Sequence, residues 1–119
     1  MNVGDIREYC LLKKGVTEEF PFDEETLVFK VMGKIFLLTN IHDPEISVNL
    51  KCDPEMAVEL REKYESVRPG YHMNKKHWNT VYYTGEFSDK EFYGMIDHSY
   101  GEVIKSLTKK LRAELEQTA

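Results

Sequence analysis

Hydrophobic residues along the chain are spaced as in a mixture of helices and strands. Apolar side chains recur three or four positions apart, the period of a helix face, over 3–13, 54–64 and 89–107. Shorter apolar segments, several of which alternate with polar residues, predict strands over 27–31, 35–41, 46–52 and 78–84. The pattern therefore predicts the order α-β-β-β-α-β-α, with a further short extended segment over 17–22.

Local signals support these boundaries. Capping residues precede each predicted helix: Asn2 with Asp5, Asp53 with Pro54, and Ser88 with Glu91. Gly15 ends the first helix, and Met32-Gly33 is a two-residue loop between two strands. The tail over 108–119 contains helix-forming residues but few apolar anchors, so it either extends the last helix or frays.

Alternation in the third strand assigns its two faces. Val48 and Leu50 point toward a core, whereas Asn49 and Lys51 point the opposite way. Together with Lys30, this second set gives the other sheet face a polar and mildly basic character. An antiparallel sheet with helices on one face satisfies the pattern. We therefore predict a single α+β domain over 1–119, folded as a two-layer sandwich.

Composition narrows the class of protein. The chain has 119 residues and 41% hydrophobic residues, enough for one core without metal or disulfide support. No apolar run reaches the ~20 residues of a membrane span, and the N-terminus lacks the pattern of a secretory signal. Cys10 and Cys52 are expected to be reduced thiols. These features predict a cytoplasmic protein that uses no cofactor and no membrane.

One stretch, 68–81 with the sequence RPGYHMNKKHWNTV, contains no acidic residue, although the chain carries a net charge of −5. It holds the single tryptophan, Trp78, two of the four histidines, His72 and His77, and the pair Lys75-Lys76. Positive charge and hydrogen-bond donors therefore gather locally in an otherwise acidic chain. This composition predicts a binding surface for an anionic partner.

Five segments of the chain resemble the MmcQ/YjbR family: GVTEEFPF, LVFKV, SVNLKCDPE, PGYHMNKKHWNTV and IDHSY. The resemblance runs in matching order from about Ile6 to Lys109, nearly the whole chain. It implies a frataxin/CyaY-like fold with a double-wing arrangement, and it implies DNA binding. It implies no enzymatic activity. The resemblance therefore favours DNA as the anionic partner.

The predicted DNA contacts combine three kinds of side chain. Lysines and arginine contact phosphates, histidines and asparagines donate to phosphates or base edges, and Trp78 stacks on a base or anchors its strand in the core. The full set is Lys30, Asn49, Lys51, Arg68, His72, Asn74, Lys75, Lys76, His77, Trp78 and Asn79. In the alternative interpretation, the lysines are simply solvated and the histidines only support the loop. A small anionic ligand or a protein partner would use the same donors.

Metal and catalytic sites are weaker hypotheses. His72 and His77 lie five positions apart, and the chain has no CxxC, HExxH or EF-hand pattern around Cys52 or elsewhere. The helical segment Asp97-His98-Ser99 places three reactive side chains on consecutive positions, so they point apart and cannot form a relay without tertiary help. A small enzyme acting through Tyr71 or the two histidines stays an alternative. We predict a protein that is not an enzyme, with no catalytic and no metal site.

Overall fold

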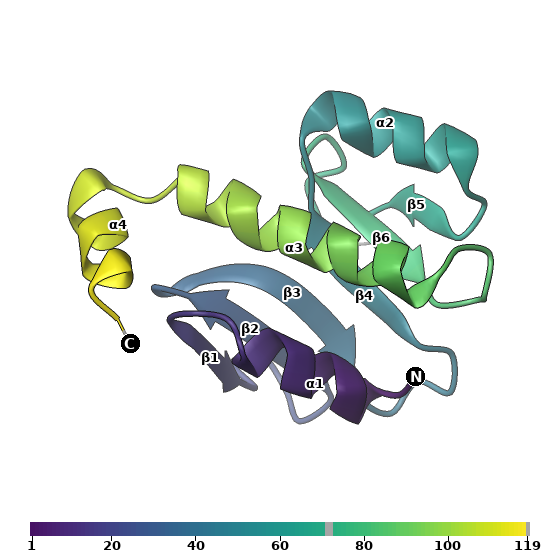
Figure 1. The fold of residues 1–119 in the computed structure, drawn as a ribbon. Coiled ribbons are helices and arrows are strands. Elements are labelled where there is room, and N and C mark those ends of the chain that lie inside the picture. The colour runs from purple at the N-terminus through teal and green to yellow at the C-terminus, as the bar shows by residue number, and fades with distance from the viewer. Residues whose placement is uncertain (71–72, 119) are drawn as a thin grey trace.

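The computed structural model of the protein describes residues 1–70 and 73–118. Its elements are α1 (Val3–Leu11), β1 (Val16–Glu19), β2 (Thr26–Val31), β3 (Lys34–Asn40), β4 (Ser47–Lys51), α2 (Pro54–Lys63), β5 (Val67–Pro69), β6 (Trp78–Tyr82), α3 (Asp89–Lys105) and α4 (Lys109–Glu116). The six strands form one antiparallel sheet in the order β1-β2-β3-β4-β6-β5. Figure 1 shows α1 and α3 lying along the same side of this sheet, with α2 next to β5 and β6.

The core lies between the sheet and the helices. Ile6 of α1 and Phe92 and Ile96 of α3 are fully buried with sheet residues such as Phe29 and Leu37. Removal of these apolar side chains from water is the main favourable term in folding. The structure therefore confirms the predicted α+β architecture, an antiparallel sheet with helices packed on one face. None of the helices among the described residues combines the length and the hydrophobicity of a transmembrane span.

The predicted helix starts are present, although at α3 only one of the two hydrogen bonds of the expected capping box is formed. At α1 the Asn2 side chain accepts from the Asp5 N–H, and the Asp5 carboxylate accepts from the Asn2 N–H, both at 2.9 Å. At α3 the Ser88 hydroxyl accepts from the Glu91 N–H at 3.1 Å. The Glu91 carboxylate instead accepts a hydrogen bond from the Tyr64 hydroxyl at 2.7 Å, so it joins α3 to the end of α2.

The tail forms a separate helix rather than an extension of α3 or a frayed end. α3 ends at Lys105, and the Thr108 side chain accepts from the Leu111 N–H at 3.2 Å, which starts α4 in a new direction (Figure 1). Leu115 of α4 is buried, and a Cβ at Gly15 would lie 2.6 Å from its Cδ1. Over Lys109–Glu116 the tail therefore neither extends α3 nor frays, because Thr108 acts as a helix cap that the apolar pattern does not reveal.

Two short edge strands complete the sheet. β1 corresponds to the extended segment expected over 17–22, shifted to Val16–Glu19. β5 was not predicted, since three residues ending in Pro69 carry almost no periodic signal. Proline is tolerated there because β5 lies at the edge of the sheet. β5 fixes the start of the loop that leads to β6, where the Gly70 N–H donates to the Trp78 carbonyl at 2.9 Å.

The Ser99 side chain of α3 replaces part of the backbone hydrogen bonding between the two central strands, β3 and β4. β3 and β4 pair directly at two positions, and one step further along they are bridged by Ser99. The Ser99 hydroxyl donates to the Phe36 carbonyl at 2.6 Å and accepts from the Lys51 N–H at 2.8 Å. Ser99 is fully buried. This arrangement joins α3 to both strands at the end of β4.

Candidate functional site

A hollow of about 520 Å³ lies at one end of the sheet, between the loop before β6 and the C-terminal end of α3. Four predicted contact residues, Lys51, Asn74, His77 and Trp78, line it together with Lys105. Its other lining residues are Cys52, Asp53, Pro54, Glu102 and Ser106. We call this feature the basic hollow. The structure thus brings together residues from β4, the loop before β6 and α3.

The basic hollow joins two stretches of the chain that lack acidic residues. One is 66–85, which includes the predicted 68–81 segment, and the other is 103–113 in α3 and α4. Lys105 and Ser106 of the second stretch line the same hollow as Asn74, His77 and Trp78 of the first. Sequence reasoning missed the second stretch. The same signal, a run without carboxylates, could have found it.

The loop before β6 is shaped by Asn74. Its side-chain oxygen accepts from the Lys76 N–H at 2.9 Å, and its carbonyl accepts from the N–H groups of His77 and Trp78 at 3.2 and 2.9 Å. The Cys52 N–H donates to the His77 carbonyl at 2.7 Å, which ties the loop to the start of α2. Asn74 therefore builds the turn that presents the neighbouring lysines.

Arg61 of α2 holds this loop from the helix side. Its Nε donates to the side-chain oxygen of Asn79 at 2.6 Å, and one of its terminal nitrogens donates to the Lys75 carbonyl and to the Trp78 carbonyl, the latter at 3.3 Å. Sequence reasoning missed Arg61, because an arginine in an amphipathic helix is ordinarily assigned to the solvated face. No periodic pattern distinguishes it from the other charged residues of α2.

Asn79 is not a surface residue. Its side chain is 1% exposed, and its amide nitrogen donates to the Ala57 carbonyl at 3.4 Å while its oxygen accepts from Arg61. Strand alternation turns Asn79 toward the helices and its neighbours Trp78 and Thr80 toward the opposite face. The prediction that Asn79 contacts DNA is therefore wrong, since its donors and acceptors are used inside the protein.

Two predicted cations lie away from the basic hollow and next to carboxylates. Lys30 on β2 forms an ion pair with Glu19 on β1. Arg68 on β5 lies over the ring of Tyr82, with its guanidinium carbon 5.2 Å from the ring centre. It also lines a depression with Glu45, Glu65 and Glu86. Because carboxylates surround both cations, neither adds to the positive charge of the basic hollow.

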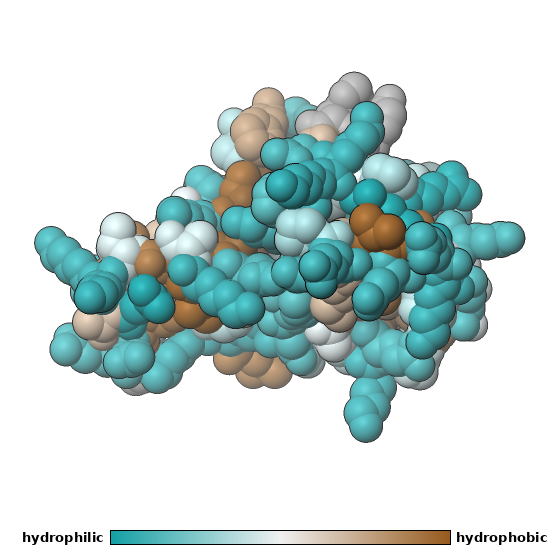
Figure 2. Space-filling model, turned by 90° about the horizontal axis from the view of Figure 1, so that it is seen from above, coloured by the Kyte–Doolittle hydropathy of each residue, from teal (hydrophilic) through white to brown (hydrophobic). Residues whose placement is uncertain are grey.

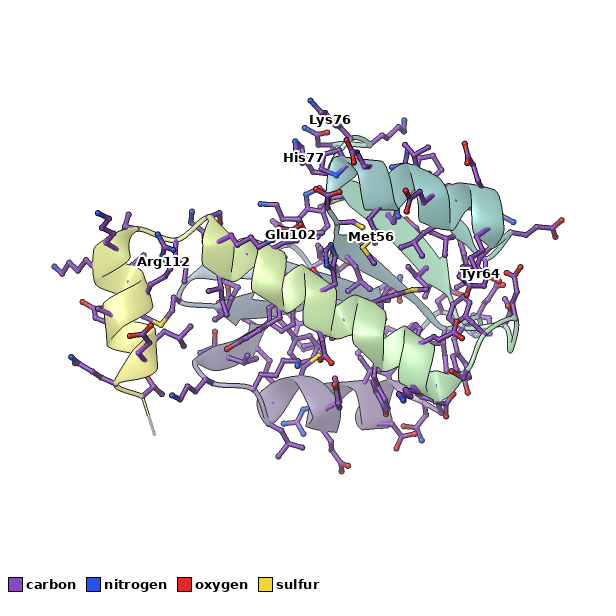
Figure 3. The ribbon with its side chains drawn as sticks, turned by 45° about the horizontal axis from the view of Figure 1, so that its top comes forward. Met56, Tyr64, Lys76, His77, Glu102 and Arg112 are labelled. Carbon is purple, nitrogen blue, oxygen red and sulfur yellow. The ribbon has the colours of Figure 1, made fainter. Side chains whose placement is uncertain are left out.

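The lysines of the loop face solvent. Lys75 and Lys76 are exposed, and Figure 3 shows Lys76 at the end of the loop, projecting away from the body of the molecule close to His77. Asn49 lies further along β4 on the face away from the helices, where it accepts a hydrogen bond from the Thr80 hydroxyl at 2.6 Å. His72, also a predicted contact, lies outside the described residues.

The two carboxylates of the basic hollow are both held by neighbours. Asp53 caps α2 by accepting from the Met56 N–H at 3.2 Å. Glu102 lies 3.4 Å from Nε2 of His98 and 3.5 Å from Nζ of Lys105. The Met56 N–H and the Lys105 ammonium are thus donors that the protein itself supplies to these two carboxylates. Lys51 and Lys105 line the hollow, and the exposed Lys75 and Lys76 lie on the loop that contributes Asn74 and His77 to it.

The consecutive residues Asp97, His98 and Ser99 have three different partners, as their positions on a helix predict. Asp97 accepts from the Tyr9 hydroxyl at 2.6 Å, Nε2 of His98 accepts from the Asp53 N–H at 3.2 Å, and Ser99 bridges the sheet. Their role in the structure is to join α3 to three other segments. Within residues 1–70 and 73–118, no three His, Cys, Asp or Glu side chains are placed to hold a metal ion.

Both cysteines are expected to be unreactive in the folded protein. Cys10 and Cys52 are free thiols with exposed fractions of 0% and 5%, and burial raises their pKa values to about 12 and about 11. Neutral thiols are poor nucleophiles, so native protein at pH 8 should react with a thiol reagent much more slowly than unfolded protein. Fast labelling of either cysteine without denaturant would contradict this.

The same pKa shifts predict a loss of stability at alkaline pH. A thiol whose pKa is raised by folding stabilises the folded state fully below its unfolded pKa of about 8.5. That contribution is lost as the pH rises from there through about 11 and about 12. The free energy of unfolding, measured in urea, should therefore fall between about pH 9 and pH 11. A Cys52→Ala variant should show a smaller fall over this range.

The chain is similar to several known proteins over most of its length. A family profile described as YjbR matches residues 11–102. The uncharacterized protein YjbR of Escherichia coli strain K12 is 32% identical over 117 residues, covering 98% of this chain and 99% of that protein. The uncharacterized protein YbdF of Escherichia coli O157:H7 is 41% identical over 91 residues, covering 76% of this chain and 75% of that protein.

Solved structures agree with the sequence comparisons. The crystal structure of the Deinococcus radiodurans protein DR2400 matches with a TM-score of 0.91 at 40% identity, covering 97% of this chain and 88% of that one. A Pseudomonas syringae protein matches with a TM-score of 0.71 at 28% identity, covering 83% and 96%. The frataxin-like and double-wing descriptions stay predictions. The profile match and the two relatives show that the chain belongs to the YjbR family.

Proposed function

We propose that this protein binds DNA without catalysing a reaction, and that the contact surface is the basic hollow together with the loop that carries Lys75 and Lys76. The observation that supports the proposal is the meeting of two carboxylate-free stretches, distant in sequence, at one hollow. In a chain with a net charge of −5, this arrangement concentrates positive charge where a phosphate backbone could approach.

The exposed lysines of the loop suit phosphate better than an apolar partner. Seen from above, the molecule is mostly hydrophilic, and hydrophobic residues show only in patches between polar side chains (Figure 2). Lysines on a projecting loop act as mobile point charges for phosphate oxygens. With three to five phosphate contacts, log K should fall with log salt at a slope of about −3 to −4.5.

Replacing both loop lysines should weaken DNA binding strongly. The variant Lys75→Ala/Lys76→Ala loses two exposed cations, and we expect its affinity for DNA at low salt to drop about tenfold or more. The salt slope should become shallower by about 2, since two fewer counterions are released. Fluorescence anisotropy titrations at two salt concentrations measure both quantities.

The matched control is Lys63→Ala/Lys90→Ala. It changes the net charge by the same amount, but these exposed lysines lie at the far ends of α2 and α3 from the basic hollow. Its affinity and slope should stay close to those of the wild type. An equal loss of affinity in both double variants would mean that total charge, and not this surface, governs binding. If the wild type does not bind DNA, or binds it independently of salt, the proposal is wrong.

A small anionic ligand is a second candidate, because the basic hollow is concave. Its volume of about 520 Å³ lies within the range of small-molecule sites, and Lys51, His77 and Lys105 converge on it. Titration with inorganic phosphate, followed by nuclear magnetic resonance of the histidine side chains, separates the two candidates. Saturable phosphate binding together with no binding of DNA would favour the small ligand.

A further inference from the structure

We infer, on the basis of the proposed function, that the DNA is held as a single strand along the face of β4 and β6 that points away from the helices. Alternate residues of these strands share that face, and the register pairs Lys51 with Trp78, Asn49 with Thr80, and Ser47 with Tyr82. We call these six residues the β4–β6 track.

The β4–β6 track begins in the basic hollow. Lys51 and Trp78 both line that hollow, so the cationic surface continues directly onto the strand face. Trp78 is half-buried. A base that stacks on this ring would place its phosphate near Lys51 and the loop lysines. The start of the track therefore combines a stacking surface with phosphate contacts.

The middle of the track is a second hollow of about 520 Å³. Asn49, Thr80 and Tyr82 line it together with the apolar side chains of Leu38 and Met73. The remaining lining residues are Thr26, Thr39, Asn40, Asp43 and Ser47. The acidic member, Asp43, accepts a hydrogen bond from the Glu45 N–H at 2.9 Å. The Thr80 hydroxyl is bonded to the Asn49 oxygen, so the Asn49 amide nitrogen and the apolar side chains are the groups left to meet the edges and faces of bases.

Tyr82 closes the far end of the track. Its ring is half-buried and lies under the Arg68 guanidinium, whose central carbon is 5.2 Å from the ring centre. Trp78 and Tyr82 are four residues apart on one strand, or about 13 Å at the usual rise per residue. Sheets that bind single-stranded RNA stack two or three bases on aromatic residues, and a base that stacks on Tyr82 would replace Arg68 over the ring.

A duplex cannot make these contacts, because its bases are stacked on one another and offer only their edges in the grooves. The two hollows and the half-buried rings of Trp78 and Tyr82 need bases that are unstacked and free to turn toward the sheet. The track is also continuous with the cationic loop, so one strand can satisfy both surfaces. The structure therefore favours a single strand over a duplex as the form of DNA that is bound.

The test uses the intrinsic fluorescence of Trp78, the single tryptophan of the chain. A deoxythymidine oligonucleotide of about 10 nucleotides, within the usual site size of a single-strand-binding module, is titrated into the wild type and compared with a duplex of equal length. We expect quenching of Trp78 emission by the single strand and an affinity for it at least about fivefold higher than for the duplex.

Two variants of Tyr82 test the far end of the track. Tyr82→Leu should weaken single-strand binding about tenfold and leave duplex binding unchanged, because it removes one stacking surface. Tyr82→Phe keeps the ring and should retain the wild-type affinity. Circular dichroism establishes that both variants are folded. If Tyr82→Leu does not fold, the quenching of Trp78 and the comparison of strands in the wild type still decide the outcome.

The possible results distinguish the inference from the proposed function. If duplex binds as tightly as single strand, responds to Lys75→Ala/Lys76→Ala and leaves Trp78 emission unchanged, the inference is overturned and DNA binding stands. If the protein binds neither single-stranded nor duplex DNA, both the inference and the proposed function are wrong. Equal losses in Tyr82→Leu and Tyr82→Phe would show that the ring does not stack on a base, which also overturns the inference.

Discussion

Replacing Arg61 by alanine is expected to destabilise the protein by about 3 kcal/mol, the cost of removing charged hydrogen bonds and leaving a buried acceptor unpaired. Arg61 donates to the side-chain oxygen of Asn79 and to two backbone carbonyls of the loop before β6. Asn79 is 1% exposed, so water cannot readily replace the lost donor. Urea unfolding followed by Trp78 fluorescence measures the change, since Trp78 lies in the affected segment.

Two comparisons make the Arg61 experiment specific. Arg61→Lys keeps the charge but lacks the planar fork that reaches Asn79 and the carbonyls together, so it should restore only part of the stability. Arg112→Ala removes an arginine from the exposed surface of α4 and should change the free energy of unfolding by less than about 0.5 kcal/mol. A loss in Arg61→Ala no larger than in Arg112→Ala would contradict the structural role assigned to Arg61.

Ser99→Ala is expected to cost about 2 to 4 kcal/mol, although it removes a single oxygen atom. The Ser99 hydroxyl satisfies the Phe36 carbonyl and the Lys51 N–H, and the substitution would leave both backbone groups buried without this partner. Thermal or urea unfolding measures the loss. Because the Ser99 hydroxyl holds the Lys51 N–H, the variant should also alter the position of this lysine, which lines the basic hollow.

Ser106→Ala is the control for this second prediction. The Ser106 hydroxyl donates to the Val103 carbonyl within the same helix at 2.6 Å, and the residue is exposed. Its removal should cost less than about 1 kcal/mol. Similar losses in the two serine variants would show that Ser99 does not act as a bridge between strands.

The fold could be predicted largely because its signals are local. The cap at Asn2, the proline at the start of α2 and the alternation of Val48, Asn49 and Leu50 each depend on a few adjacent residues. Where the signal is short, prediction failed. β5 has three residues, and α4 starts in a new direction after α3 at one capping threonine, Thr108.

The candidate site was only partly predictable, because contacts across the fold decide which polar residues are available. Lys75, Lys76 and His77 lie on a surface loop, as their composition suggests. Asn79, one residue beyond Trp78, is instead turned inward by strand alternation and taken up by Arg61, eighteen positions earlier in the chain. No local sequence pattern predicts that hydrogen bond, and none predicts that Lys105 of α3 lines the basic hollow.

The bridge made by Ser99 has a consequence for how the domain moves. Since β3 and β4 pair directly at two positions, the sheet can be divided into two three-stranded halves, β1-β2-β3 and β4-β6-β5, which are joined by those pairs and by α3. Protection of backbone amides from hydrogen exchange should therefore be highest inside each half and lowest between β3 and β4. A small rotation of one half against the other would widen or narrow the basic hollow at the end of β4 without unfolding either half.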